Sequence, residues 1–294
     1  APFAPAMVVR AVDAVGATVT AFTGTVDLAL AVNPTAATPS GTLSVAAVAG
    51  VATFGNVILT TAGAGYTIAT TSGALAPDTT IAVTVLNAAP AQLTLVSGNA
   101  QSGAVITVLP APFVVRVIDA FGNGVSGYAI DWAITSAGGA LSATATATDA
   151  GGFASTTLTL PSAAGTATVQ ATAGGLAGSP QVFTATATAG AASQLVFSLN
   201  TGAGIAGATM TPGWVIEARD ALGNLVPTFG GPVTVVLSNG PGGATLGGTT
   251  TVNAIGGVAT FADLTIDRVA PSWVLIASSR SEEHTSELQS LAYL

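Results

Sequence analysis

The side chains that usually carry enzyme chemistry are almost missing from this sequence of 294 residues. It has no Cys, all five of its cations are Arg, and its single His is His284. Outside the segment that holds His284, this excludes thiol nucleophiles, Schiff-base lysines, thiolate or histidine metal sites and a Ser-His-Asp relay. The acids fall mostly on predicted turns and solvent faces and form no catalytic pair, so we expect no enzyme.

Two aspartates in similar sequence settings are the remaining candidates for a site. Asp119 is followed by Asn123 and Asp220 by Asn224, with a Gly directly before each Asn. Carboxylate and amide oxygens could serve as calcium ligands, and calcium is the one cofactor left open. The alternative is an Asx-type turn, in which Asp accepts backbone N–H groups and Gly takes positive φ. We favour the turn, because calcium needs about six to eight oxygens and the acids rarely cluster.

The charge and hydropathy of the chain limit its partners. The net charge of -8 argues against a nucleic-acid groove or a basic membrane patch. Half of the residues are apolar and the mean hydropathy is +0.70. Thr, Ser, Gly, Asn and Pro nevertheless interrupt every apolar run before the roughly 18 residues that a membrane helix needs. We therefore expect no nucleic acid and no membrane span in this fragment.

The elements that must position the aspartates belong to a threefold repeat. Asp13, Asp119 and Asp220 lie 106 and 101 residues apart, each at the end of an apolar run. A second marker follows each of them at Gly50–Phe54, Gly152–Ser155 and Gly257–Phe261. Two markers in a fixed order, with a period near one hundred residues, indicate three tandem domains.

Strand signals dominate inside each repeat: apolar residues alternate with Thr, Ser or Ala, and Gly, Pro or Asn interrupts them at short intervals. The fold class is therefore all-β, as tandem immunoglobulin-like antiparallel β-sandwiches. Seven strands are expected in the middle repeat, at 92–96, 113–119, 129–135, 140–146, 152–160, 166–173 and 181–188.

The alternation of apolar and polar residues predicts which face of each strand is buried and on which face the aromatic side chains lie. Phe113 and Val115 share one side of their strand, and Trp132 lies on the apolar side of the next strand. Exposed rings could bind sugars, but Trp132, Trp214 and Trp273 fall on buried or repeat positions, so core packing is favoured. In the two Thr ladders, at 144–148 and 184–188, we expect Thr outside and Ala inside.

The strand ending in Asp-Ala-x-Gly-Asn, the Gly-Val-Ala-Thr-Phe marker and the strand at Gly65–Ala69 together resemble bacterial Ig-like tandem repeats of the invasin and intimin kind over residues 1–279. Ala17 departs from this pattern, since it replaces the turn Asn in the first repeat. The resemblance implies extracellular display on a bacterial cell surface, with the repeats as a stalk and any adhesive tip elsewhere in the parent chain.

The composition changes abruptly at Arg280. Arg280–Ser290 holds three of the four Glu and the only His, and it can be back-translated into a sequence that resembles a short-read sequencing adapter. We predict that residues 280–294 are a non-native tail, the alternative being a genuine polar C-terminal segment. The tail is then expected to leave the strand around Trp273–Ala277 as an unpaired sheet edge.

Four segments follow from these observations: 1–88, a repeat lacking its first strand; 89–190, a complete repeat; 191–279, a repeat lacking its last strand; and the tail. The expected function is a structural spacer in a bacterial surface or secreted protein, with neighbouring repeats of the parent chain as partners. The alternatives are a ligand-binding adhesin module, with a host or glycan ligand, and an accessory carbohydrate-binding module of a secreted enzyme. The short joints at 87–91 and 189–193 predict an elongated particle.

Overall fold

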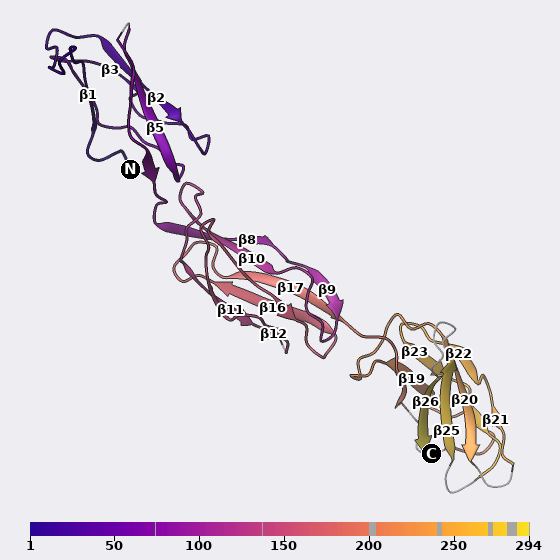
Figure 1. Cartoon of the computed structure of the whole chain (residues 1–294). Helices are drawn as coiled ribbons and strands as arrows, with labels where there is room; N and C mark the ends of the chain where they lie inside the picture. Colours follow the sequence, from indigo (N-terminus) through magenta and orange to yellow (C-terminus); the bar gives the residue numbers. More distant parts are fainter. Residues whose placement is uncertain are drawn as a thin grey trace.

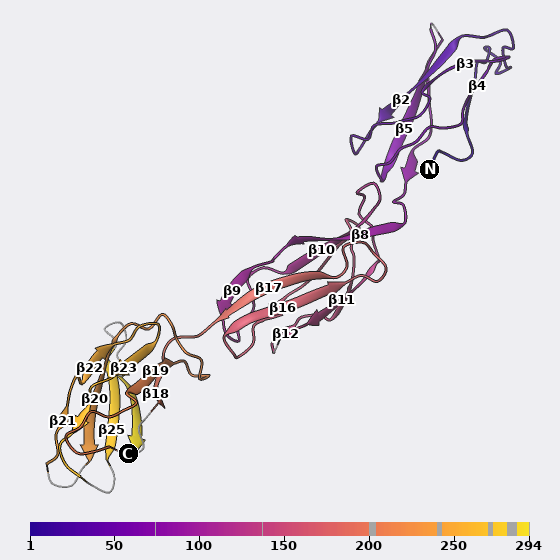
Figure 2. The ribbon, with the colours of Figure 1, turned by 180° about the vertical axis from the view of Figure 1, so that it is seen from behind.

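The alternating, β-branched segments of the sequence form strands throughout the computed structural model, which describes residues 1–73, 75–136, 138–199, 204–239, 243–269, 273–280 and 287–293. Within these residues no helix has the length and apolar character to cross a membrane. Three β-sandwiches follow one another along an extended molecule (Figure 1), and the view from behind shows the same arrangement (Figure 2).

The middle repeat has a three-stranded sheet, β14-β10-β8, and a five-stranded sheet, β13-β11-β16-β17-β9, with a short β12-β15 ladder. Its strands are β8 (Pro90–Ser97), β9 (Gln101–Ala104), β10 (Phe113–Asp119), β11 (Ala129–Ile134), β12 (Ala140–Leu141), β13 (Ala145–Ala147), β14 (Phe153–Thr156), β15 (Leu158–Thr159), β16 (Gly165–Thr172) and β17 (Gln181–Thr188). All seven expected strands are present, two of them divided. Sequence alternation missed β9, which pairs in parallel with β17.

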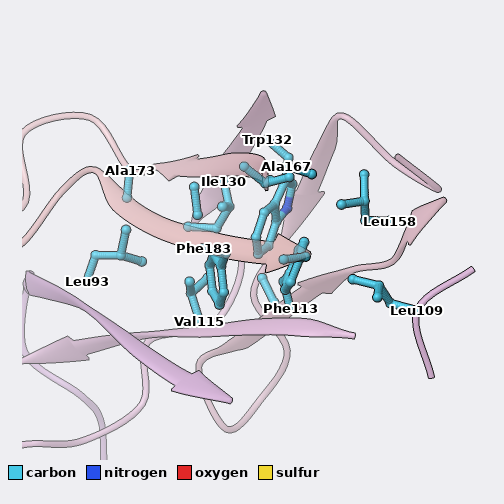
Figure 3. Packing of buried hydrophobic residues seen from close by; sticks show 14 of the residues in the cluster. Leu93, Leu109, Phe113, Val115, Ile130, Trp132, Leu158, Ala167, Ala173 and Phe183 are labelled. Atoms are coloured by element: carbon cyan, nitrogen blue, oxygen red, sulfur yellow. The ribbon is translucent and has the colours of Figure 1, made fainter. Parts of the chain in front are cut away.

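The core of the middle repeat lies between its two sheets (Figure 3). Phe113 is 1% exposed and Val115 is fully buried, as their shared face predicts. The Phe183 ring lies 4.7 Å from the Phe113 ring and 6.0 Å from the Trp132 ring, measured between centroids. Trp132 Nε1 donates a hydrogen bond to Thr146 Oγ1 at 2.8 Å. Trp132 therefore packs in the core, and its polar atom is satisfied without a disulfide nearby.

The third repeat has the sheets β18-β19-β23 and β22-β20-β25-β26 and a short β21-β24 ladder. Trp214 is fully buried and Trp273 is 7% exposed, so both belong to the core as expected. The strands are β18 (Gln194–Leu199), β19 (Trp214–Arg219), β20 (Pro232–Asn239), β21 (Leu246–Gly247), β22 (Thr251–Asn253), β23 (Val258–Phe261), β24 (Thr265–Ile266), β25 (Val274–Arg280) and β26 (Glu287–Tyr293).

The expected unpaired edge at Trp273–Ala277 is wrong. β26, which lies in the tail, pairs antiparallel with β25 from Val274↔Tyr293 to Arg280↔Glu287. The third repeat thus has a strand where we expected the last one to be missing. Main-chain pairing requires only an extended backbone, so a segment of different composition can still complete a sheet. The expectation rested on four polar residues of the tail: Glu287 begins β26, and Glu282, Glu283 and His284 lie outside the described residues.

The first repeat has the larger sheet β3-β2-β5-β6, with β7 also pairing with β5, and a two-stranded sheet, β1-β4. In the other two repeats the smaller sheet has three strands. The strands are β1 (Met7–Arg10), β2 (Thr25–Val32), β3 (Ser44–Ala46), β4 (Val51–Phe54), β5 (Gly63–Thr71), β6 (Asp78–Thr79) and β7 (Val83–Val85).

The two Thr ladders differ from each other. On β17 the Thr side chains are exposed and the Ala side chains buried, as expected. Around β13 the order is reversed: Ala145 and Ala147 are exposed, whereas Thr146 and Thr148 point inward. Thr146 accepts the Trp132 N–H, and Thr148 Oγ1 donates to Val125 O at 2.6 Å. Thr146 lies opposite the buried Ile130 of the neighbouring strand β11, and hydrogen-bond partners on the buried side satisfy these two inward-facing Thr residues.

Candidate functional site

The Asp119 turn closes on itself at the end of β10. Asp119 is 2% exposed, and its Oδ1 accepts hydrogen bonds from the backbone N–H groups of Phe121 at 2.8 Å and Asn123 at 2.9 Å. Its own N–H donates to Asn123 O at 2.9 Å, and Gly122 takes a φ of +86°. A residue with a Cβ rarely adopts such a φ, so the Asp and the Gly together fix the turn.

The Asp220 turn repeats this geometry at the end of β19. Asp220 is 2% exposed, and its Oδ1 accepts the N–H groups of Leu222 at 2.9 Å and Asn224 at 2.8 Å. Gly223 has a φ of +85°. The two turns are therefore the same device in successive repeats.

The second carboxylate oxygen of each turn holds the chain that links two repeats. Asp119 Oδ2 accepts a hydrogen bond from Ala88 N–H at 2.8 Å, and Asp220 Oδ2 accepts one from Gly190 N–H at 2.9 Å. Within the third repeat, Gln194 Nε2, at the start of β18, also donates to Asp220 O at 2.8 Å. Each linker is thus attached by its backbone to the turn of the repeat that follows it.

The Asn123 side chain reaches the preceding repeat. Its Oδ1 accepts Ala62 N–H at 2.8 Å, and its Nδ2 donates to Thr60 O at 2.8 Å, both in the loop between β4 and β5. Nδ2 also donates to Asp119 Oδ2 at 2.8 Å, which fixes the orientation of the amide. Asn123 therefore joins the first repeat to the middle repeat.

The Asn224 side chain makes the same contacts one repeat later. Its Oδ1 accepts Ala164 N–H at 2.8 Å, and its Nδ2 donates to Ser162 O at 2.8 Å. We call each set of contacts a clasp: the first clasp is Asp119 and Asn123 with Thr60, Ala62 and Ala88, and the second is Asp220 and Asn224 with Ser162, Ala164 and Gly190.

The first repeat has the turn without the clasp. Asp13 Oδ1 accepts the N–H groups of Val15 at 3.0 Å and Ala17 at 2.9 Å, and Gly16 has a φ of +84°. Ala17 stands where the other turns have Asn, and it has no amide to extend outward. Asp and Gly therefore build the turn, and Asn adds the contact with a neighbouring repeat.

Hydrogen bonding keeps the clasp carboxylates charged. Burial raises the pKa of Asp220, but the Asn224 side chain and the N–H groups of Gly190, Asn224 and Leu222 outweigh burial and lower the pKa to about 2. The pKa of Asp119 is likewise raised by burial and lowered overall by the corresponding donors. Near neutral pH the hydrogen bonds to both carboxylates are therefore charge-assisted, and they are stronger than those between neutral groups.

The four residues considered as calcium ligands are arranged as an Asx turn and a clasp. Both carboxylate oxygens of Asp119 and Asp220 accept N–H donors, and Oδ1 of Asn123 and Asn224 each accepts a backbone N–H. The donors that point at these oxygens leave fewer lone pairs for a cation. Calcium binding is the alternative that a titration has to test, and this geometry favours the simple turn.

Two other acids, Asp149 and Asp78, accept backbone hydrogen bonds of their own. Asp149 closes a turn of its own, accepting Gly151 N–H at 2.8 Å and Phe153 N–H at 2.9 Å, and Asp78 accepts Thr79 N–H at 2.8 Å. In the described part of the chain, no three His, Cys, Asp or Glu side chains gather in a group that could hold a metal ion.

Sequence reasoning found the clasp residues but missed the residues that they hold. Nothing in the sequences of the loops at 60–62 and 162–164 marks them as partners of an Asn some sixty positions later. One signal was available: the turn Asn is present in the two repeats that follow another repeat in this chain, and it is replaced in the first.

Comparison with known proteins agrees with the observed fold. The family model for the bacterial Ig-like domain (group 1) matches residues 110–188, so the middle repeat is a bacterial Ig-like domain. No curated protein matches the chain.

Solved structures that are similar to the chain include FdeC, InvD and invasin. The FdeC adhesin of Escherichia coli is 21% identical, covers 96% of this chain and 90% of its own, and has a TM-score of 0.48. InvD of Yersinia pseudotuberculosis is 15% identical, with 98% and 91% covered and a TM-score of 0.47. Invasin, a bacterial integrin-binding protein, is 16% identical, with 98% and 56% covered and a TM-score of 0.43. At these identities and scores, the similarities carry no argument about function.

Proposed function

We propose that this chain is a spacer of Ig-like repeats in a bacterial surface or secreted protein, holding an adhesive or other tip away from its anchor. The observation that carries the proposal is the recurrence of the clasp. The same Asp, Asn and linker contacts occur at both joints, with every cross-joint distance between 2.8 and 2.9 Å. A spacer needs a joint of this kind, because an extended chain of domains is maintained only when each domain is fixed relative to the next.

The clasps restrict both routes by which a joint could bend. The linker cannot swing freely, because Ala88 and Gly190 are bound to the carboxylates of the following repeats. The preceding repeat cannot tilt away without breaking the two hydrogen bonds that its loop makes with Asn123 or Asn224. Since all of these contacts are short and several involve backbone groups, they define one preferred orientation at each joint.

The distribution of reactive groups supports a role without catalysis. Among the described residues, the two buried acids are Asp119 and Asp220, which serve the joints, and their lowered pKa makes them poor general bases near neutral pH. A surface or extracellular location is part of the same proposal, and the match of the middle repeat to bacterial Ig-like domains supports it.

Small-angle X-ray scattering of the full chain in neutral buffer tests the proposal. The expected result is a distance distribution with a long tail, like that computed from the extended arrangement in Figure 1. A compact particle would contradict the spacer function. A glycan array provides the second test: a spacer gives no saturable signal, whereas saturable binding would favour the ligand-binding module.

A further inference from the structure

The first clasp contains two adjacent residues that can react with each other. Asn123 is followed by Gly124, whereas its counterpart Asn224 is followed by Leu225. An Asn side chain is converted to Asp or isoaspartate when the main-chain N of the next residue attacks its Cγ atom. A following Gly allows this attack best, because it has no Cβ to shield the N or to restrict the backbone. The two clasps therefore present the same amide beside different neighbours.

The main-chain N of Gly124 is free to act as this nucleophile. Gly124 lies opposite Ile118 of β10, and the hydrogen bonds of this short ladder are made by Asn123 and Val125 on either side of it. Among the described residues, the Gly124 N–H has no hydrogen-bond partner. Asn123 and Gly124 are both half-buried, so water also reaches them.

Close packing requires a glycine at this position of the middle repeat. A Cβ on Gly124 would lie 2.1 Å from Gly151 O, closer than real Cβ atoms come to an oxygen. Leu225, at the corresponding position of the third repeat, has a side chain that is 38% exposed. The reactive pair thus follows from the way the middle repeat packs one turn against another, and the second clasp does not contain it.

The clasp itself restrains the reaction. Asn123 Oδ1 accepts Ala62 N–H, and its Nδ2 donates to Thr60 O and to Asp119 Oδ2, each at 2.8 Å. To form a bond with Gly124 N, the amide carbon must turn away from these three partners. The reaction therefore requires the first joint to open.

We propose that Asn123 is a site of spontaneous deamidation, which loosens the first joint permanently and spares the second. Gly124 N forms a bond with Cγ of Asn123, the bond between Cγ and Nδ2 breaks, and Nδ2 leaves as ammonia with the proton of the Gly124 N–H. Water then opens the cyclic imide. Attack at Cγ gives Asp, and attack at the main-chain carbonyl carbon gives isoaspartate.

Either product weakens the clasp. A carboxylate at position 123 has no N–H to donate to Thr60 O, and it places a negative charge beside the Asp119 carboxylate, whose Oδ2 now accepts the Asn123 amide. Opening permits the reaction, and the product keeps the joint open. This inference does not depend on the spacer function, because it concerns the chemistry of one amide and not the purpose of the joint.

The test incubates the full chain at physiological temperature and mildly alkaline pH, and then measures deamidation at each Asn by digestion and mass spectrometry. Asn123 is expected to react at least about tenfold faster than Asn224, with isoaspartate among the products. Asn239, the other Asn that precedes a Gly, is read from its own peptide. Leu225→Gly is the matched variant, and it is expected to raise the rate at Asn224 to about that at Asn123.

Two further variants separate the opening of the joint from its consequence. Ala62→Pro removes the N–H that binds Asn123 Oδ1 and is expected to speed the reaction about fivefold, the factor that corresponds to one lost hydrogen bond, whereas Ala62→Ser keeps the N–H and the rate. Asn123→Asp carries the product from the start and is expected to broaden the distance distribution in small-angle scattering.

Four results would each overturn the proposal. They are equal rates at Asn123 and Asn224, an unchanged rate at Asn224 in Leu225→Gly, an unchanged rate at Asn123 in Ala62→Pro, and scattering of Asn123→Asp that matches the unchanged chain. The first three are rates of a chemical reaction, so their failure is distinct from that of the spacer function, which rests on the shape of the unmodified chain.

Discussion

Removing both clasp amides should loosen the molecule while leaving its domains folded. The change is the double substitution Asn123→Ala and Asn224→Ala. Each Asn makes two hydrogen bonds to the preceding repeat and at least one to the Asp of its own turn. The bonds that close the turn and those that hold Ala88 and Gly190 do not use the Asn side chain, so the turns and linker contacts remain.

The magnitude follows from the two cross-joint bonds at each Asn. A protein hydrogen bond contributes a net 0.5–1.5 kcal/mol or so, so each joint loses about 2 kcal/mol of orientational free energy. Since about 1.4 kcal/mol corresponds to a factor of ten, bent orientations should become roughly thirtyfold more populated at each joint. The loss falls on the joint and not on a core, so the unfolding transitions of the individual repeats should shift little.

Small-angle scattering of the full chain measures this change. The double variant is expected to show a shorter maximum dimension and a broader distance distribution than the unchanged chain. Asn56→Ala is the matched control, because Asn56 binds Thr42 within the first repeat through its side-chain oxygen at 2.9 Å and its nitrogen at 3.0 Å. The clasp argument would be refuted if the double variant scattered like the unchanged chain, or if Asn56→Ala produced the same shortening.

Acid should also loosen the second joint. The folded pKa of Asp220 is lowered to about 2, so the contribution of its carboxylate to the stability of the joint is complete above the unfolded pKa of about 4 and is lost as the pH falls toward 2. Small-angle scattering between about pH 4 and pH 2 should show the maximum dimension decrease, and Asp220→Asn should make this pH-dependent decrease smaller. A joint that first loosens near pH 6 would contradict the assignment of the transition to Asp220. Trp132→Ala removes a side chain that is 3% exposed and should destabilise the middle repeat by about 3–5 kcal/mol in urea unfolding, whereas Val182→Ala, at a position 46% exposed, should change stability by less than about 1 kcal/mol. Titration with calcium should give no saturable heat; saturable heat that is abolished by Asp119→Ala would show that the turn is a cation site after all.

The strands and their buried faces could be derived from the sequence, because alternation is a local property of a pleated chain. Phe113 and Val115 share one face of their strand whatever lies opposite them, and Trp132 lies on the apolar face of its own strand. The Asp and Gly of each turn were equally predictable, since both act on backbone groups within four residues. These features gave the fold class, the repeat and the positions of the candidate site residues.

The partners of those residues were decided only by the tertiary structure. Asn123 binds residues about sixty positions earlier, β9 pairs in parallel with a strand far along the chain, and β26 completes a sheet despite its unusual composition. Thr146 and Thr148 face inward, where Trp132 on the neighbouring strand and Val125 offer hydrogen-bond partners. In each case the deciding contact is a hydrogen bond between groups distant in sequence. Such a bond leaves no periodic signal in either segment, because its geometry exists only once the sandwiches are folded and placed end to end.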